Sequence, residues 1–426
     1  MALRRNVDDE GTVRESRLLG GIRVVSEEMR SSKSASIGIW VNLGSRDEGS
    51  DELGGSHFLE HLLFKGTNKR TAQEISTAIE SRGGYLNAFT DRDMTCFHAK
   101  VLSRDLDVAV DILSDIVINP LIKQEDVEKE LHVVLSEIDA RDDDPADLIH
   151  DLSFETAWGE NTSARPVLGD RRVLSSMMNS TIRRYYEGGY NPRRIIVTCA
   201  GSVDHEALVE MLEKGLTLKR AGRSVERVSP VFQSKRRHIK RGTSQVQVAV
   251  SSEGLPQSHQ DRYALGILNT YLGIGASSKL FQEVREKRGL VYSIFSNVYS
   301  LSDSGLLNIV AGTLDENVEK LLGTVAIELG KAGRELDYSK TEDTKHKTIG
   351  MLALRSENTE ARMMQLGVSA LREGKPKSFS EVIEGISLVR GEQVGELAER
   401  LLSPDRLALT TLGLSEETRK RLEASY

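Results

Sequence analysis

The chain has 426 residues, of which 38% are hydrophobic and 28% are charged, the balance of an ordinary water-soluble globular protein. This length exceeds what a single hydrophobic core usually organises, so two or three domains are expected. A net charge of -7 and a pI near 5.8 argue against a nucleic-acid-binding protein, which needs a basic surface to neutralise phosphates.

The sequence gives no sign of secretion or of membrane insertion. Residues 1–16 lack the apolar stretch of a signal peptide and contain acidic residues, which are unusual in transit peptides. No stretch approaches the roughly 20 apolar residues that a membrane span needs. We therefore expect a cytoplasmic protein of bacterial type, with a processed organellar matrix protein as the alternative. Cys96 and Cys199 lie in separate apolar runs and are expected to be buried free thiols.

The first half of the chain combines strand and helix patterns. Strands are expected at 21–28 and 34–45, the second because isoleucine and valine alternate with small residues. A short apolar helix follows within 54–67, and a second helix at 71–84 has Thr71 as its expected N-cap. The elements expected next are a strand pair at 85–102, helices at 105–119, 123–145 and 146–158, a buried strand at 193–203 and a helix at 204–216.

Residues 217–236 interrupt this pattern. They are basic, lack helical periodicity and contain Pro230, so we interpret them as a linker. The same order of elements then begins again, with strands expected at 244–252, 291–300, 305–314 and 406–414, and helices at 261–273 and 316–333. We therefore predict an α+β fold with two similar domains, at 1–216 and 237–426, each a mixed β-sheet flanked by helices.

The helix within 54–67 carries His57, Glu60 and His61 among apolar residues, with Ser56 as its expected N-cap. Residues four apart lie one turn apart on one helix face, so both imidazoles can reach a single metal ion at about 2.0–2.1 Å. The carboxylate of Glu60 lies beside that face, where it can hold a water molecule on the metal more easily than it can act as a third ligand. The pattern is the H-x-x-E-H order of a zinc-binding helix.

A catalytic zinc site needs a third protein ligand and an open position for water. Glu130 and Glu137, in the helix expected at 123–145, are about 20° apart around the helix axis and two turns apart along it. One of them can bind the metal while the other supports a ligand by a hydrogen bond. Helical geometry alone does not say which, and such a pair by itself is also typical of a solvated acidic stripe.

Two segments, "GGSHFLEHLLFKGT" at 54–67 and "EKELHVVLSEID" at 128–139, resemble the inverted-motif zinc peptidases, the family of pitrilysin, insulin-degrading enzyme and the mitochondrial processing peptidase. The resemblance implies a zinc-binding catalytic domain at 1–216 with one Zn²⁺ per chain. It also implies a role for each residue of the motif: His57, His61 and Glu137 as metal ligands, Glu60 as the general base and Glu130 as a supporting catalytic residue.

The second half of the chain carries "SSKLFQEVREKRGLVYSIFS" at 277–296, which resembles the C-terminal signature of the same family. This likeness implies a substrate-binding domain at 237–426, in which Arg288 and Tyr292 reach the substrate. In the family the substrate adds to a sheet edge as an extended strand. The expected edge here is "YLNAFTDRD" at 85–93, with three residues beside the peptide: Asn87, Ala88 and Phe89.

We therefore predict a zinc metalloendopeptidase that acts on short or unfolded peptides. The size resembles that of the short family members, which form a clamshell with a second subunit, so a homodimer is expected and a heterodimer is the alternative. The intact motif resembles the catalytic subunit of the processing peptidase. Two other interpretations remain open, a subunit that needs a glycine-loop partner and a non-catalytic assembly subunit. The segment "YLGIGASSK" at 271–279 is only modestly glycine-rich.

The acidic run at 139–147 has two interpretations. It can begin a helix, with Asp144 as N-cap, Pro145 at the first position and Asp147 in the first turn. Alternatively, its carboxylates can attract substrates that carry arginine, as acidic residues near the cleft do in the processing peptidase.

Overall fold

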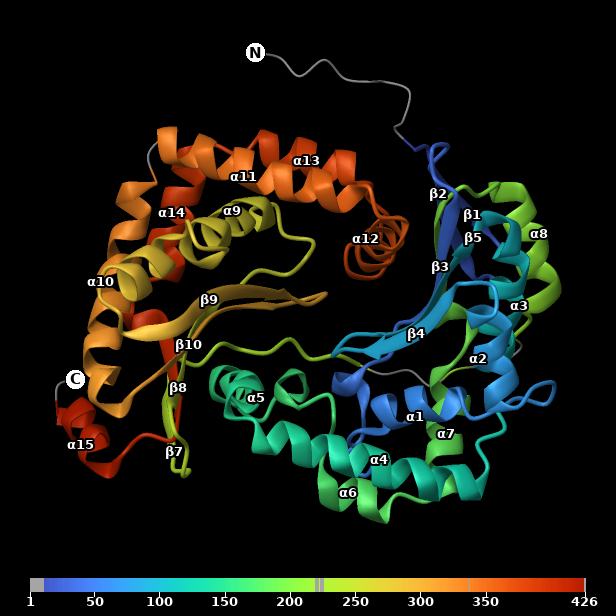
Figure 1. Ribbon diagram of the computed structural model, residues 1–426, viewed down its shortest axis with the longest axis horizontal. Helices are drawn as coiled ribbons and strands as arrows, with labels where there is room; N and C mark the ends of the chain where they lie inside the picture. Colours follow the sequence, from blue (N-terminus) through green and yellow to red (C-terminus); the bar gives the residue numbers. More distant parts are fainter. Residues whose placement is uncertain (1–10, 219–221, 223–225, 337, 425–426) are drawn as a thin grey trace. The chain divides into compact units, whose positions relative to one another are not determined.

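The structure is a computed structural model that describes residues 11–218, 222, 226–336 and 338–424. The chain forms two compact units, each built on one mixed β-sheet with helices packed against it, which confirms the predicted fold class (Figure 1). Three segments make up each unit: Met1–Ile138, Pro166–Arg227 and Leu352–Val382 form unit 1, and Asp139–Arg165, Val228–Met351 and Ile383–Tyr426 form unit 2.

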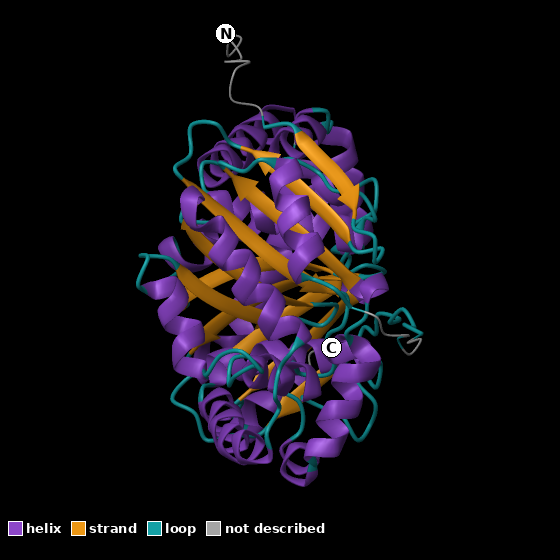
Figure 2. Cartoon of the chain, turned by 90° about the vertical axis from the view of Figure 1, so that its right-hand side faces the viewer, coloured by secondary structure: helices purple, strands orange, loops and turns teal. Residues whose placement is uncertain are grey.

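Among the described residues, the sheet of unit 1 has six strands in the order β1-β2-β6-β3-β5-β4. Strands β2 and β6 run parallel, and every other neighbouring pair is antiparallel. Figure 2 shows the strands in orange among the helices. The bounds are β1 Val13–Arg17, β2 Arg23–Glu28, β3 Ser34–Val41, β4 Tyr85–Thr90, β5 Thr95–Leu102 and β6 Ile195–Gly201. The pair β4–β5 confirms the strand pair expected at 85–102.

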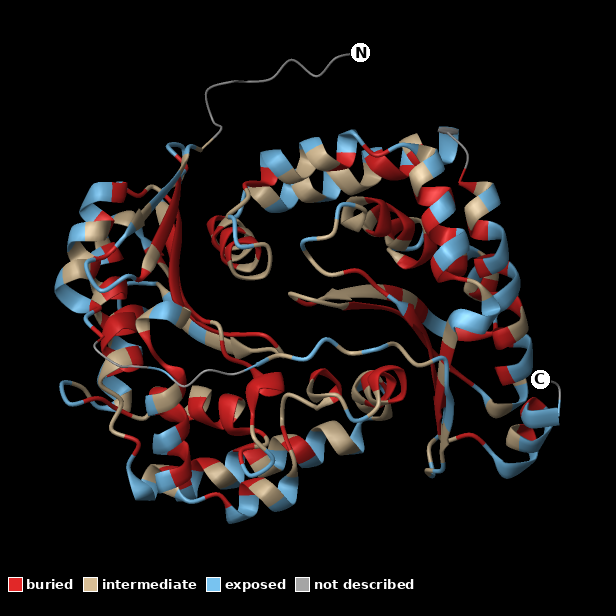
Figure 3. Ribbon diagram, turned by 180° about the vertical axis from the view of Figure 1, so that it is seen from behind, coloured by how far each residue is buried: buried red, intermediate tan, exposed pale blue. Residues whose placement is uncertain are grey.

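Helices cover the sheet of unit 1, so its central strands β3 and β6 are buried along almost their whole length (Figure 3). Helices α3 and α8 contact strands β5, β3 and β2, and α12 contacts β6, β3 and β2. The helices up to residue 215, followed by α12, are α1 Gly55–Leu63, α2 Ala72–Glu80, α3 Leu106–Ile118, α4 Gln124–Asp143, α5 Pro145–Trp158, α6 Arg171–Ser176, α7 Asn179–Gly189, α8 His205–Gly215 and α12 Thr359–Arg372.

The sheet of unit 2 repeats the design of the first. Its order, β7-β11-β8-β10-β9, is that of unit 1 without β1, and the parallel pair β7–β11 corresponds to β2–β6. The strands are β7 Arg236–Ile239, β8 Val246–Glu253, β9 Val291–Ser300, β10 Gly305–Thr313 and β11 Leu407–Leu412. The helices not yet given are α9 Arg262–Gly273, α10 Val318–Glu335, α11 Tyr338–Ser356, α13 Phe379–Ser387, α14 Gly391–Leu401 and α15 Glu416–Ala424.

The units are not contiguous halves of the chain, because each takes one helix from the other half. Helix α5 belongs to unit 2, where it packs on β8 and β11, and α12 belongs to unit 1. Hydroxyl pairs anchor both helices: Ser36 Oγ lies 2.8 Å from Thr359 Oγ1, and Thr410 Oγ1 lies 2.9 Å from Thr156 Oγ1. The units therefore differ from the ranges 1–216 and 237–426 by these two segments. The chain leaves unit 1 after Arg227, inside the expected linker.

Several local expectations are met. Thr71 caps α2 in a capping box with Glu74, and both cysteines are buried and free. Asp144 caps α5 by accepting from the Ala146 N–H, with Pro145 in the first turn, as the helix-start interpretation of the acidic run expects. None of the described helices is long and apolar enough to cross a membrane.

Candidate metal centre and active site

Gly54 is the N-cap of helix α1, and its φ of +87° lies in the left-handed region that favours glycine. The expectation that Ser56 caps this helix is wrong, because Ser56 lies inside it. The Glu48 carboxylate instead accepts hydrogen bonds from the backbone N–H groups of Gly54, at 2.7 Å, and Ser56, at 2.8 Å. A carboxylate satisfies the free N–H groups at a helix start and interacts favourably with the helix dipole. The Ser56 hydroxyl is left to pair with Tyr185 Oη at 2.6 Å.

The two histidines of α1 face one carboxylate of α4. Figure 1 shows the two helices next to each other. Glu137 Oε2 lies 3.5 Å from His57 Nε2 and 3.7 Å from His61 Nε2. The two imidazole rings have centroids 4.7 Å apart. Among the described residues these three form the one group of histidine, cysteine or acidic side chains that brings three ligand atoms within 4.8 Å of one another.

This donor set fits zinc. Ligand atoms 2.0–2.2 Å from a tetrahedral zinc ion are roughly 3.3–3.6 Å apart, close to the two distances from Glu137 Oε2. Two imidazoles and one carboxylate are typical of a catalytic site, and three protein ligands leave one position for water. All three residues are partly exposed, so solvent and substrate can reach this position.

The other glutamate of α4 lies behind His61. Glu130 Oε2 accepts from His61 Nδ1 at 3.2 Å, and Glu130 Oε1 pairs with Lys65 Nζ at 2.7 Å. A proton on Nδ1 leaves the Nε2 lone pair of His61 free on the side where Glu137 lies. The two glutamates, which helical spacing alone could not distinguish, therefore occupy different positions. Glu137 lies beside both Nε2 atoms and Glu130 holds the orientation of one ring.

Burial prepares His57 for binding a cation. Desolvation, with a smaller effect from the neighbouring His61, lowers the pKa of His57 to about 4. The ring is therefore neutral at pH 7, the form that coordinates a metal. Its Nδ1 atom is buried and makes no hydrogen bond to the described residues.

Glu60 is part of α1 and faces the end of the edge strand β4. The Thr90 hydroxyl, at the end of β4, donates a hydrogen bond of 2.6 Å to Glu60 Oε2. Burial raises the pKa of Glu60, and the Thr90 hydrogen bond and the nearby His61 partly offset this rise. A raised carboxylate pKa is closer to neutral pH, which suits a group that takes up and returns a proton.

Strand β4, which is expected to bind the substrate, lies at an edge of the sheet. Strand β4 is the last strand in the sheet order and pairs with β5, which leaves its other side without a neighbouring strand among the described residues. The side chains alternate across it: Ala88 packs against the core that includes α1, whereas Phe89 packs against Trp40 with ring centroids 5.8 Å apart. The Asn87 side-chain oxygen accepts from the Ala88 N–H at 2.9 Å.

Arg288 and Tyr292 lie in unit 2, near a π-helical turn at Phe281–Glu286. Arg288 Nη1 donates to the backbone oxygen of Glu283 at 2.7 Å and to its carboxylate at 2.9 Å. Tyr292, near the start of β9, is 78% exposed. Contact of these two residues with a substrate stays a prediction.

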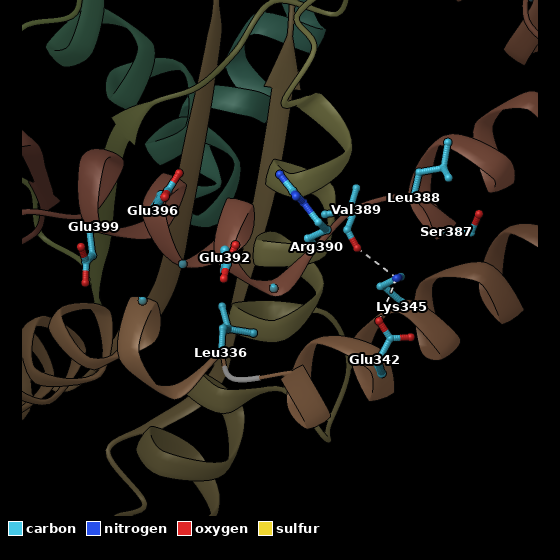
Figure 4. Close-up of a pocket in the computed structure, with 13 residues that line it drawn as sticks. Leu336, Glu342, Lys345, Ser387, Leu388, Val389, Arg390, Glu392, Glu396 and Glu399 are labelled. Atoms are coloured by element: carbon cyan, nitrogen blue, oxygen red, sulfur yellow. Dashed lines mark hydrogen bonds and ion pairs between the residues drawn. The ribbon is translucent and has the colours of Figure 1, made fainter.

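Unit 2 also contains a hollow of about 850 Å³ between α10, α11, α13 and α14 (Figure 4). Lys345 lines it, donating to the Val389 backbone oxygen at 3.0 Å and pairing with Glu342 at 2.8 Å. Three further glutamates line it: Glu392, Glu396 and Glu399. None of the residues predicted as site residues lines this hollow.

Sequence reasoning missed three side chains that support the site. Lys65 lies just past the end of α1, and nothing in the sequence pairs it with Glu130. Thr90 ends the strand that had been recognised, but nothing in the sequence pairs it with Glu60. Glu48 precedes the helix by several residues, and its capping role depends on how the chain folds back.

Replacing Glu130 by glutamine is expected to weaken zinc binding about 10–100-fold, because a neutral amide holds His61 and its proton less firmly than a carboxylate. Titration with zinc against a competing chelator measures this change. Glu128→Gln, an exposed position on the same helix, is the matched control. Equal zinc affinities for the two variants would show that Glu130 does not support the metal site.

Comparison with known proteins gives consistent matches. Residues 23–171 match the family described as insulinase (peptidase family M16), and residues 179–348 match the peptidase M16 inactive domain. An uncharacterized zinc protease of Streptomyces coelicolor is 39% identical over 97% of this chain and 92% of its own length. The uncharacterized zinc protease YmxG of Bacillus subtilis is 34% identical over 90% of this chain and 94% of its own.

Solved structures share the fold. The crystal structure of a Helicobacter pylori protease matches with a TM-score of 0.87 and 21% identity, over 95% of this chain and 99% of that one. A chain of complex III2 from Candida albicans matches with a TM-score of 0.82 and 19% identity, over 97% and 99% of the two chains.

Proposed function

The chain belongs to peptidase family M16, and we propose that it is a zinc metalloendopeptidase that hydrolyses peptide bonds in short or unfolded polypeptides. The observation that carries this proposal is the convergence of His57, His61 and Glu137 beside the carboxylate of Glu60. The names of the bacterial relatives, zinc proteases, support it. In a chain that had lost catalytic activity, these four side chains would not be expected to keep this geometry.

Each residue of the centre has a part in the proposed mechanism. His57, His61 and Glu137 would hold one zinc ion, which supplies Lewis acidity and lowers the pKa of bound water. Glu60 accepts a proton from the attacking water and returns it to the leaving amine. Glu130 acts through His61 by fixing its tautomer and ring orientation, which makes it a positioning residue.

The substrate would add to the open edge of β4 as an extended strand. Main-chain hydrogen bonds to the segment that holds Asn87, Ala88 and Phe89 read backbone more than side chains, so specificity would be broad. Arg288 and Tyr292 would contact the bound peptide, and Tyr292 could stabilise the oxyanion. A clamshell formed with a second copy of the chain, or with a different subunit, would exclude folded proteins. A cytoplasmic location stays a prediction.

Digestion of a quenched-peptide library by the purified full chain tests this function. We expect cleavage that stops with a chelator and returns with zinc, and a mass that corresponds to a dimer in light-scattering measurements. No cleavage by zinc-loaded protein, alone or after a partner subunit is added, would contradict the proposal and favour an assembly role. Cleavage only after a partner is added would indicate a partner-dependent processing subunit.

A further inference from the structure

We infer that Thr90 is a positioning residue for Glu60, and that a buried ion network at the turn between β4 and β5 holds Thr90 in place. The inference rests on the proposed function, since it concerns the orientation of the group that would move the proton. All the residues involved belong to unit 1.

The Thr90 hydroxyl has one proton to donate, and it donates a hydrogen bond of 2.6 Å to the Glu60 carboxylate. The neighbouring Thr95 hydroxyl lies 3.3 Å away and directs its own proton to the Leu43 backbone oxygen at 3.1 Å. Thr90 and Thr95 are the last cross-strand pair of the hairpin, which fixes the backbone on both sides of the hydroxyl. The Glu60 side chain, by contrast, has several rotatable bonds, so this contact selects its orientation.

Hydrogen bonds within the turn that follows Thr90 stabilise it. Asp91 N–H donates to the Met94 backbone oxygen at 2.8 Å. The Asp91 carboxylate accepts from the backbone N–H groups of Asp93, at 2.7 Å, and Met94, at 2.9 Å. This arrangement satisfies the backbone of a tight turn locally and leaves the end of β4 little freedom.

Three arginines from distant parts of the chain converge on this turn. Arg46, in the short helical turn Ser45–Asp47, pairs with Asp93 at 3.1 Å. Arg372, in the last turn of α12, reaches Asp93 at 3.1 Å and Asp91 at 2.6 Å. Arg227 donates to the Asp93 backbone oxygen at 2.7 Å.

Several of the charged groups in this network are buried, which makes any unpaired charge among them costly. Arg46 and Asp93 are 2% and 1% exposed, and Arg227 also forms two hydrogen bonds to the buried Asp47, at 2.8 and 2.6 Å. A buried charge is costly unless it is paired and hydrogen-bonded, so each arrangement that breaks one pair is disfavoured. The turn is therefore held in one geometry, and a rigid support is what a proton-transferring group requires to stay within reach of its partner.

The variants Thr90→Val and Thr90→Ser distinguish a role of Thr90 in positioning Glu60 from a role in packing. Valine keeps the shape and removes the hydroxyl, whereas serine keeps the hydroxyl. We expect Thr90→Val to lower kcat about 10–100-fold with KM and zinc content unchanged, because a small misplacement of a reacting group costs up to about 10²-fold. Thr90→Ser should recover most of the loss. Thr198→Val is the matched control, since it removes a buried hydroxyl from the same sheet that bonds Trp40 and Met363 and not Glu60.

The result for Thr198→Val should be a lower unfolding temperature with kcat unchanged. Equal kcat for Thr90→Val and wild type would overturn the inference while leaving the proposed function intact. An inactive wild type would instead contradict the proposed function. A second readout does not depend on activity: in crystals grown without zinc, the Glu60 carboxylate should move away from position 90 in Thr90→Val and stay in contact with it in Thr90→Ser.

Arg372→Gln tests the supporting network. It removes both ion pairs of Arg372 and leaves every residue of the candidate metal centre in place. Because the turn that holds Thr90 would be less firmly fixed, we expect kcat to fall a few-fold at unchanged KM, together with a lower unfolding temperature. A lower unfolding temperature with wild-type kcat would show that the network stabilises unit 1 without positioning Thr90.

Discussion

Replacing Glu60 by glutamine is expected to lower kcat for peptide hydrolysis about 10²–10⁴-fold, because the amide cannot accept the proton of the attacking water. The substitution is nearly isosteric, and the amide oxygen can still accept the hydrogen bond from Thr90. Zinc content and KM should therefore stay close to the wild-type values. Steady-state cleavage of one quenched peptide, measured beside metal analysis of the same samples, checks this result.

Glu80→Gln is the matched control for Glu60, because Glu80 is exposed at the end of α2. Its kcat should equal that of the wild type. If Glu60→Gln kept wild-type kcat, another group would have to take the proton. If it lost zinc as well as activity, Glu60 would contribute to metal binding, and the separate roles proposed for the histidines and this carboxylate would be wrong.

Replacing Glu137 by alanine is expected to weaken zinc binding by more than about 100-fold, since loss of a direct ligand should exceed the 10–100-fold effect of an outer partner. The Glu137 side chain is 41% exposed, so its truncation leaves little cavity and should barely alter the fold. Titration with zinc against a competing chelator, and peptide cleavage at a fixed zinc concentration, measure the two consequences.

Zinc should also stabilise the wild type and not this variant. A ligand at 100 times its Kd adds about 2.7 kcal/mol to the free energy of unfolding, which raises the unfolding temperature measurably. Glu128→Ala, on the same helix, should keep the full zinc-dependent shift. An equal shift in Glu137→Ala would place the binding site elsewhere in the chain.

Which residues of the candidate centre share a helix face could be predicted, because helical periodicity is local. The spacing of His57 and His61 fixes which face of α1 they share, whatever the rest of the chain does. The spacing of Glu130 and Glu137 likewise places both on one face of α4. Which of them meets the histidines depends on how α4 packs against α1, and no local pattern records that geometry. The resemblance to a known family supplied the assignment that periodicity could not.

The repeated order of elements could also be predicted, and the two sheets share it strand for strand apart from β1. The exchange of α5 and α12 could not, since an amphipathic helix does not record which sheet it covers. Strands β1 and β7 were missed because they are short edge strands with partly exposed patterns. Glu48 and Thr90 act through contacts between distant segments, which sequence spacing does not show.

We propose that His57, His61 and Glu137 hold one zinc ion. Anomalous X-ray diffraction at the zinc absorption edge, from crystals of the zinc-loaded full chain, tests it most directly. We expect one strong peak about 2.0–2.2 Å from both Nε2 atoms and from the Glu137 carboxylate, with a solvent molecule in the fourth position. A peak at any other site, or a Glu137 carboxylate far from both imidazoles in an intact unit 1, would contradict it.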